Sequence, residues 1–551
     1  MQSKGKFSDN MRINQVIENI LNQLCPFLEE QAREISEMTA IGKALGAGKE
    51  IGTLLKMILS IARRFTKADG GTLYLTDPVN QYLEFHVVQN DTLALNQEGT
   101  QIKLPAVPLF NQDRSPNMAN VSSFVFHTGD IVNIKDVYKT RRFQFDGTKK
   151  FDTALHYRSR SMVVIPMKNH EDDIIGILQL INAVDRNSGR IIPFDRDAQE
   201  KAAALASQAS VILTQQMLIL EMEELFEAFI RAIAVSIDEK SKHTGGHIQR
   251  VTELALMIAE KINQDRHLFK GVRLSDDQID ELRIASLMHD TGKITTPDHL
   301  IGKSSRLETV VDRIELVKTR WELFKTHLKL NAAREKLALC DTAPFKEDIL
   351  KIDADCREKM DLLDREFDLL SRINATKTDI ERSDWKQMST IQQKTFSIDG
   401  RDIPYLTRDE VENLSISKGT LTASERIIIN SHVWVTEKIL SKLPWPKKLA
   451  NIPSIAGAHH EKLDGSGYPL KLGEKDLNIQ ARILAVADIF EALSAQDRPY
   501  KKPMTLSHTV QVLEEMAGKN EIDKDIVALF LSTGIHLIYA EKHLSPSQID
   551  L

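Results

Sequence analysis

The sequence holds 551 residues, more than a single hydrophobic core serves, so we expect two to four domains of about 150 residues each. Lysine and arginine total 72 against 78 acidic residues, and this formal charge of -6 excludes a general attraction for nucleic acid or anionic membranes. No apolar run approaches the roughly 18 residues that span a bilayer, the start lacks a secretory signal, and the three cysteines are scattered, so we expect a cytoplasmic protein without a membrane segment.

The first segment, residues 1–35, predicts an amphipathic helix. Its apolar residues Ile13, Val16, Ile17 and Ile20 keep a helical spacing. We therefore expect an N-terminal helix that leads into the first domain.

Residues 36–216 change to an α/β pattern. Four runs are rich in β-branched residues and are bounded by Gly, Asp or Asn, which predicts strands with a helix at each end of the segment. The order resembles a GAF domain, with FDTALHYRSRSMVVIPM (151–167) and IIGILQLIN (174–182) as the recognisable parts. The resemblance implies a module for small-molecule sensing or dimerisation. A GAF fold that binds no ligand is the alternative.

Residues 217–235 read as a helical connector. The segment carries apolar residues at short helical spacing and no helix breaker, so it is expected to continue the last GAF helix. Because such connectors pair as coiled coils, we expect a homodimer.

The rest of the chain, residues 236–551, is predicted to be helical, with an inserted helical hairpin at about 307–414. Within the insertion, apolar residues step by three and four from Ile314 to Leu328 and again from Ile349 to Leu370. A narrow apolar strip of this kind favours pairing of two antiparallel helices. The hairpin is either a docking arm for a protein partner or a structural addition, and the sequence does not choose.

Candidate metal-binding residues lie on both sides of this insertion in the sequence. Ser275 and Gln278 form a capping box, so His289 and Asp290 close a helix, and their side chains diverge enough to straddle a metal centre. A lone pair of this kind is more often structural. Further candidates strengthen the metal interpretation: His247 after a Gly-Gly turn, His432 and Asp488 inside apolar helices, where a polar group needs a partner, and the adjacent His459 and His460.

Five ordered segments, HTGGHIQRV, HDTGKI, the helix around His432, HHEKLDGSGYP and RILAVADIFEALSAQDRPYK, resemble the signatures of HD-GYP cyclic di-GMP phosphodiesterases. The resemblance covers about 232–306 and 415–540. It implies an HD-type helical bundle with an iron or manganese cluster, although nitrogen and carboxylate ligands alone leave zinc open. The implied metal ligands are His247, His289, Asp290, His432, His459, His460 and Asp488.

His243 decides between two ions and three. Some family members place a third metal ligand at its position, but Gly245 and Gly246 make a continuous helix from His243 to His247 doubtful, so both a binuclear and a trinuclear centre stay open.

The resemblance also supplies residues for substrate. Lys293, Arg498 and Lys501 match positions near the phosphates, with solvated side chains as the alternative, and Tyr468 of the GYP turn is expected to approach the ligand. His289, Asp290 and Lys293 are the predicted catalytic residues.

Two functions from different classes follow. The favoured one is a hydrolase that opens cyclic di-GMP to pGpG, and further to GMP, in bacterial second-messenger signalling under control of the GAF domain. The other is a receptor or adaptor that binds nucleotide or protein without turnover. The full set of titratable ligand candidates favours catalysis. Within the enzyme class, another cyclic dinucleotide such as cyclic GMP-AMP is an alternative substrate.

Overall fold

The computed structural model divides the chain into two compact units, Met1–Leu225 and Phe226–Leu551. Within the predicted leading helix, the described residues are helical and the remainder lies outside the described part. The structure describes residues 17, 19–22, 24, 25, 32, 51–77, 81–98, 104–185, 188–240, 246–340, 346–375, 379–495 and 503–551.

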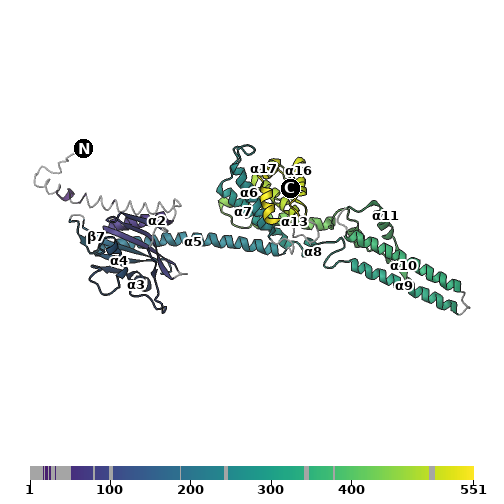
Figure 1. The fold of residues 1–551 in the computed structure, drawn as a ribbon, viewed down its shortest axis with the longest axis horizontal. Helices are drawn as coiled ribbons and strands as arrows, with labels where there is room; N and C mark the ends of the chain where they lie inside the picture. Colours follow the sequence, from purple (N-terminus) through teal and green to yellow (C-terminus); the bar gives the residue numbers. More distant parts are fainter. Residues whose placement is uncertain are drawn as a thin grey trace. The chain divides into compact units, whose positions relative to one another are not determined.

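The first unit is built on an antiparallel sheet with the strand order β3-β2-β1-β7-β6-β5, to which β4 and β8 add at β2 and β7 (Figure 1). The four strand predictions are confirmed, because those runs form β1, β2, β6 and β7. The strands are β1 (Ala68–Asp77), β2 (Tyr82–Asn90), β3 (Leu95–Glu98), β4 (Val107–Pro108), β5 (Val132–Ile134), β6 (Met162–Lys168), β7 (Ile174–Val184) and β8 (Ile191–Ile192).

Alternation along the central strands gives the sheet two apolar faces. Leu73 and Leu178 pack with the helices α2 (Ile51–Thr66) and α5 (Arg196–Lys240) on one face. On the other face, Tyr74 and Ile177 pack with α3 (Val121–Thr128) and with aromatic residues around Phe143. A further helix, α4 (Asp146–Ala154), follows α3. The predicted α/β sensor fold is therefore confirmed.

Helix α5 continues without a break from the sheet unit through the predicted connector. Its start contributes Leu205 to the core of the first unit, and its end contributes Ile230 and Ile237 to the core of the second. By length and composition α5 is the one helix among the described residues that could cross a membrane. Ser, Gln and Thr residues interrupt its apolar residues between Leu205 and Leu220.

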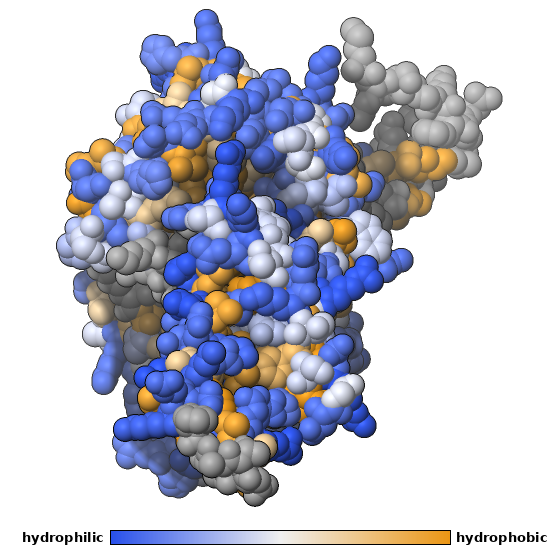
Figure 2. Space-filling view, turned by 90° about the vertical axis from the view of Figure 1, so that its right-hand side faces the viewer, coloured by the Kyte–Doolittle hydropathy of each residue, from blue (hydrophilic) through white to orange (hydrophobic). Residues whose placement is uncertain are grey.

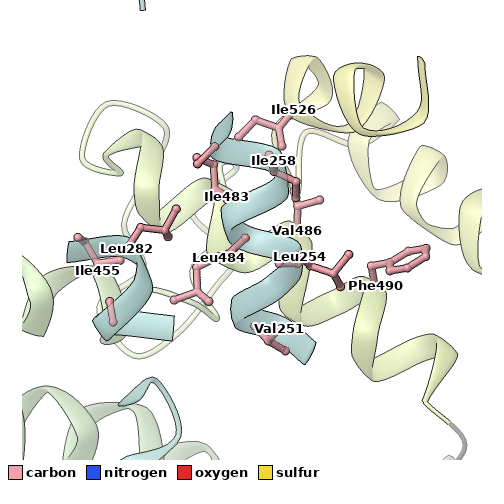
Figure 3. Close-up of a cluster of buried hydrophobic side chains, with 14 of the residues drawn as sticks. Val251, Leu254, Ile258, Leu282, Ile455, Ile483, Leu484, Val486, Phe490 and Ile526 are labelled. Atoms are coloured by element: carbon pink, nitrogen blue, oxygen red, sulfur yellow. The ribbon is translucent and has the colours of Figure 1, made fainter. Parts of the chain in front are cut away.

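The second unit is a helical bundle around one apolar cluster (Figure 3). Side chains of α6, α7, α14, α15 and α17 meet there, for example Leu254, Leu282 and Phe490. The predicted helical HD-type region is confirmed. Its helices outside the insertion are α6 (His247–Gln264), α7 (Asp276–Met288), η2 (Thr291–Thr295), α8 (Asp298–Ile301), α13 (Ala423–Leu440), η3 (Lys447–Leu449), α14 (Ile452–Ala456), α15 (Ile479–Ser494), α16 (Leu506–Gly518), α17 (Lys524–Ser532) and α18 (Ile535–His543).

The insertion contains the two long helices α9 (Ile314–Cys340) and α10 (Lys346–Ala375), which run antiparallel (Figure 1). The indole of Trp321 donates to the carbonyl of Leu363 at 3.0 Å, while Lys336, further along α9, binds Asp353 near the start of α10. The segment also holds elements that the sequence reading missed. These are α11 (Arg382–Ile391), the two-stranded sheet of β9 (Thr395–Ile398) and β10 (Arg401–Pro404), and α12 (Arg408–Leu414).

Candidate metal centre

The His-Asp pair lies where helix α7 ends. The predicted capping box of Ser275 and Gln278 is present at the start of α7, and His289 is its C-terminal cap. Thr436 of α13 fixes this end, because its hydroxyl donates to the carbonyl of His289 at 3.0 Å and accepts from the amide of Gly292 at 2.8 Å. The pair is therefore held against α13 by backbone contacts.

Gly292 lies where η2 packs closely against α13. A Cβ at this position would lie 1.9 Å from the carbonyl oxygen of His432, so only glycine allows η2 and α13 to approach this closely. The approach brings Asp290 and His432 together, with 3.4 Å between Asp290 Oδ1 and His432 Nε2.

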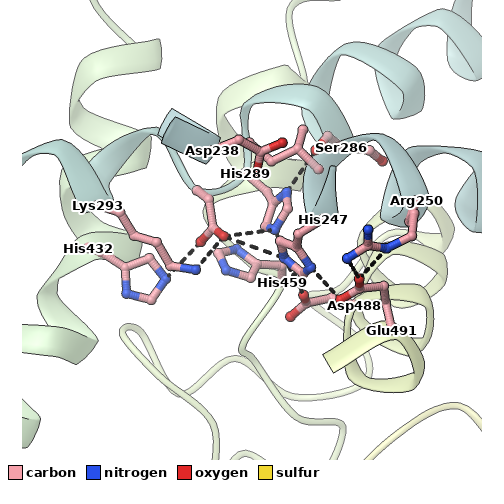
Figure 4. Close-up of polar contacts among 12 residues, drawn as sticks. Asp238, His247, Arg250, Ser286, His289, Lys293, His432, His459, Asp488 and Glu491 are labelled. Atoms are coloured by element: carbon pink, nitrogen blue, oxygen red, sulfur yellow. Dashed lines mark hydrogen bonds and ion pairs between the residues drawn. The ribbon is translucent and has the colours of Figure 1, made fainter. Parts of the chain in front are cut away.

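Three histidines, His289, His432 and His459, direct a ring nitrogen into the same space (Figure 4). Their Nδ1 groups donate to backbone carbonyls three residues earlier, at 2.6 to 2.7 Å. The three Nε2 atoms are buried and have no hydrogen-bond partner in the described part of the chain. A buried polar atom without a hydrogen bond is costly, and a metal ion would satisfy all three.

The remaining predicted ligands complete two groups of donor atoms. His432, His459 and His460 form one, and His247, His289 and Asp290 form the other, with the atoms of each group within 4.8 Å of one another. Asp290 reaches both groups, since its Oδ2 atom lies 3.4 Å from His289 Nε2 while Oδ1 faces His432. The donors therefore fit more than one ion.

Asp488 of α15 lies on the other side of this space. Its Oδ1 atom is 3.4 Å from His247 Nε2 and 3.8 Å from His289 Nε2, and its Oδ2 atom is 4.0 Å from His460 Nδ1. The buried carboxylate in the apolar helix thus has cationic or metal-binding neighbours, as its sequence context predicted.

The histidines differ in protonation in the metal-free protein. Burial and the neighbouring His460 and His289 hold the pKa of His459 well below its usual value, and burial lowers that of His460 to about 4. Both rings are neutral near pH 7, the form that binds metals. Burial also acts to lower the pKa of His247, but the carboxylates of Asp290 and Glu491 raise it to about 10.

Two predicted substrate residues border the donors. Lys293 Nζ lies 2.5 Å from Asp290 Oδ2, and although burial opposes ionisation of Asp290, Lys293 and His289 hold its pKa well below the usual value. The ring of Tyr468 lies 5.0 Å from that of His460, centre to centre. The bond from Tyr468 to Pro469 is cis.

The turn that carries Tyr468 is fixed by Glu461. Its buried carboxylate accepts from the amides of Leu470, Lys471 and Leu472 at 2.6 to 3.1 Å. A Cβ on Gly467 would lie 2.4 Å from the amide nitrogen of Lys462, so the turn folds back tightly on the histidine pair.

Our sequence reading missed Glu491 and Arg250. The buried carboxylate of Glu491 accepts from His247 Nδ1, and it also accepts from Arg250, whose Nε lies 2.8 Å away. The spacing in the sequence could have identified both residues. Glu491 follows Asp488 by three positions and Arg250 follows His247 by three, so each lies on the same helix face as a predicted ligand.

Three predicted residues, His243, Arg498 and Lys501, lie outside the described part of the chain. His459 and His460 follow α14 in a turn instead of ending a longer helix, because the helix stops at Ala456. The other predicted ligands gather from α6, the α7 end, α13, the turn after α14, and α15.

Comparison with known families places this site in an HD domain. The HD domain family matches residues 244–373, a second HD domain family matches 408–526, and the GAF domain family matches 50–213. The chain therefore combines an N-terminal GAF domain with an HD domain, which confirms both resemblances.

The curated relatives each match about a fifth of this chain. A 3'3'-cGAMP-specific phosphodiesterase 3 of Vibrio cholerae is 42% identical over 19% of this chain and 22% of its own length. A cyclic di-GMP phosphodiesterase of Thermotoga maritima is 38% identical over 20% of this chain and 29% of its own length. The chain thus matches about a quarter of each relative. A solved GAF domain from an Acinetobacter phosphoenolpyruvate-protein phosphotransferase is 14% identical, with coverage of 34% of this chain and 98% of that one and a TM-score of 0.26.

Proposed function

We propose that the chain is a metal-dependent phosphodiesterase that hydrolyses cyclic di-GMP to pGpG, and pGpG further to GMP. The observation that carries this proposal is the set of three buried Nε2 atoms of His289, His432 and His459, which face one space and have no hydrogen-bond partner among the described residues. The names of the relatives supply the substrate class.

The metal ligands of this proposal are those of the sequence prediction, with His243 as the additional ligand of a third ion. Nitrogen and oxygen donors without thiolate suit iron or manganese. Bound ions would activate a water molecule and stabilise negative charge on the phosphate. Asp290 carries negative charge to both donor groups, and Glu491 orients His247.

The residues beside the metal-ligand candidates are assigned to substrate binding. Lys293 is half-buried beside Asp290, and we assign it to a phosphate oxygen, where its charge offsets that of the substrate. Tyr468 lies against His460 with an aromatic face for a guanine base. Arg498 and Lys501 are the proposed outer phosphate contacts.

The GAF domain offers a regulatory site. It contains a cavity of about 340 Å³ lined by Thr72, Tyr74, Gln89, Tyr157 and Gln179, among others. We assign a small-molecule ligand to this cavity.

Helix α5 is the proposed path from that cavity to the HD domain. Near its end, Glu227 binds Arg283 of α7, and Lys240 donates to the carbonyl of Ile294, the residue after Lys293. A change in α5 would thus act on the middle of α7 and on η2, which follows it.

The proposed homodimer is formed by α5 in the cytoplasm. Five apolar side chains of α5 are at least half exposed and follow the three-four spacing of a coiled-coil seam. They are Val211, Leu218, Met222, Leu225 and Phe229. Such a pair buries the apolar stretch of α5 without a membrane.

A second candidate substrate is 3'3'-cGAMP, because three relatives of 39 to 42% identity carry that specificity in their names. The test compares hydrolysis of cyclic di-GMP and 3'3'-cGAMP at equal concentration by iron-loaded and manganese-loaded protein, with products separated as linear dinucleotide and mononucleotide. Faster opening of cyclic di-GMP supports the proposal, and faster opening of 3'3'-cGAMP reassigns the substrate. Binding of either without turnover supports the receptor alternative.

A further inference from the structure

Helix α9 exposes a row of four leucines along its length. Leu316, Leu323, Leu330 and Leu337 are 56%, 49%, 45% and 74% exposed. A single exposed leucine is ordinary, but four on one line of a helix form a continuous apolar strip. We call these residues the α9 leucine row.

The row is separate from the face that holds the hairpin together. Val317, Trp321 and Phe324 are buried in the core that α9 shares with α10. At 100° per residue, the leucine row points on average roughly 140° away from that face. The hairpin core therefore does not use it.

The spacing of the row indicates what covers it. The leucines recur every seven residues over 21 residues, or roughly 30 Å of helix. A strict period of seven matches another helix wound around the first and matches neither a sheet nor a flat surface. The residues three positions after the first three leucines, Thr319, Thr326 and Ala333, are small and leave room for knobs from that second helix.

The charges beside the row indicate which helix this is. Each leucine is preceded by a charged residue, and the order along α9 is Glu315, Glu322, Lys329 and Lys336. Lys336 also binds Asp353 within the hairpin, so the central residues Glu322 and Lys329 carry most of the charge argument. In an antiparallel pair of two α9 helices, the acidic half of each meets the basic half of the other. In a parallel pair, each of these residues faces the residue five positions further on in the other helix, so Lys329 lies against Arg334, which is unfavourable. The pattern is therefore complementary to itself in the antiparallel direction.

We propose that the α9 leucine row binds the same row of a second copy of this chain, antiparallel and centred near Thr326. This interface is independent of the catalytic proposal and of the α5 coiled coil, since neither uses these residues. It gives the inserted hairpin a function as a self-association arm.

Disulfide cross-linking of the full chain tests both the contact and its direction. In a background with Cys25→Ser, Cys340→Ser and Cys356→Ser, a single cysteine is placed at Thr326, Thr319 or Ala333. At the centre of an antiparallel pair, Thr326→Cys cross-links to itself under mild oxidation. Thr319→Cys and Ala333→Cys do not cross-link alone, but a mixture of these two proteins does.

Leu350→Cys on α10 is the matched control, because this leucine is exposed but lies off the row. It should give no cross-link. Self-linking by Thr319→Cys, Thr326→Cys and Ala333→Cys alike would replace the antiparallel arrangement with a parallel one and overturn the proposal. A Thr326→Cys protein that folds, by circular dichroism, and yields no dimer would also overturn it.

Charge reversal provides a second test that a folding defect does not imitate. Glu322→Lys places a lysine opposite Lys329 of the second copy, at both ends of the symmetric contact, and should lower the Thr326→Cys cross-link several-fold. Adding Lys329→Glu restores opposite charges and should restore the yield. Glu358→Lys, an exposed charge on α10, serves as the control that leaves the yield unchanged. Failure of the double variant to recover would contradict the proposed pairing of charges.

Discussion

Glu491 provides the sharpest test of how the chain holds its donors. In Glu491→Gln, one carboxylate oxygen becomes an NH₂ group, which cannot accept. In the native protein, one carboxylate oxygen of Glu491 accepts from His247 and the other accepts from Arg250, so one of these donors loses its acceptor in the variant. Glu491 is fully buried, and water has no access to replace the lost bond. Removing such a supporting partner lowers metal affinity about 10- to 100-fold.

That loss corresponds to about 1.4 to 2.7 kcal/mol of binding free energy. The assay is metal retention against a graded series of chelator concentrations, with helical content followed by circular dichroism. Glu253→Gln is the control, because Glu253 binds Lys542 and His543 outside the donor groups. Wild-type metal affinity in Glu491→Gln, or an equal loss in the control, would refute the role of Glu491 as the support of His247.

Three further predictions address packing, charge and control. Gly292→Ala forces α13 away from η2, because the new Cβ would lie 1.9 Å from the His432 carbonyl oxygen. We expect the free energy of unfolding to fall by about 3 kcal/mol, measured as a lower Tm. An unchanged Tm would contradict the close approach. Lys293→Met removes the cation beside Asp290 and should slow turnover about a hundredfold with the metal retained, whereas unchanged turnover would exclude Lys293 from the phosphate site. Two residues inserted after Met222 rotate the two parts of α5 relative to each other by roughly 200°, whereas seven inserted residues nearly restore the coiled-coil phase. Only the two-residue insertion should therefore disturb activity. Equal activity of both variants would argue against coupling through α5.

Residues with a strong local signal could be predicted from the sequence. Asp488 stands in an apolar helix, where an uncompensated carboxylate is costly, and the structure gives it histidine neighbours. The capping box at Ser275 also predicted the start of α7 correctly. The prediction that these distant residues form one site came from the family resemblance. Residue spacing alone does not predict that α6 and α15 lie together.

Features that depend on contacts between distant segments were missed. Gly292 resembles a helix stop in the sequence, and its need for glycine arises from His432, 140 positions later. The pairing of Glu491 with His247 joins helices separated by the whole insertion. The strands β9 and β10 are only four residues each and lack a long apolar alternation.

The most direct test of the central claim is turnover as a function of bound metal. Protein stripped of metal and reloaded with iron or manganese should hydrolyse cyclic di-GMP in proportion to the metal bound. The double variant His289→Ala/Asp290→Ala should bind less metal and show no hydrolysis, while keeping most of its helical content, because the bundle core does not depend on these two residues. Full hydrolysis by the stripped protein or by the double variant would contradict the account.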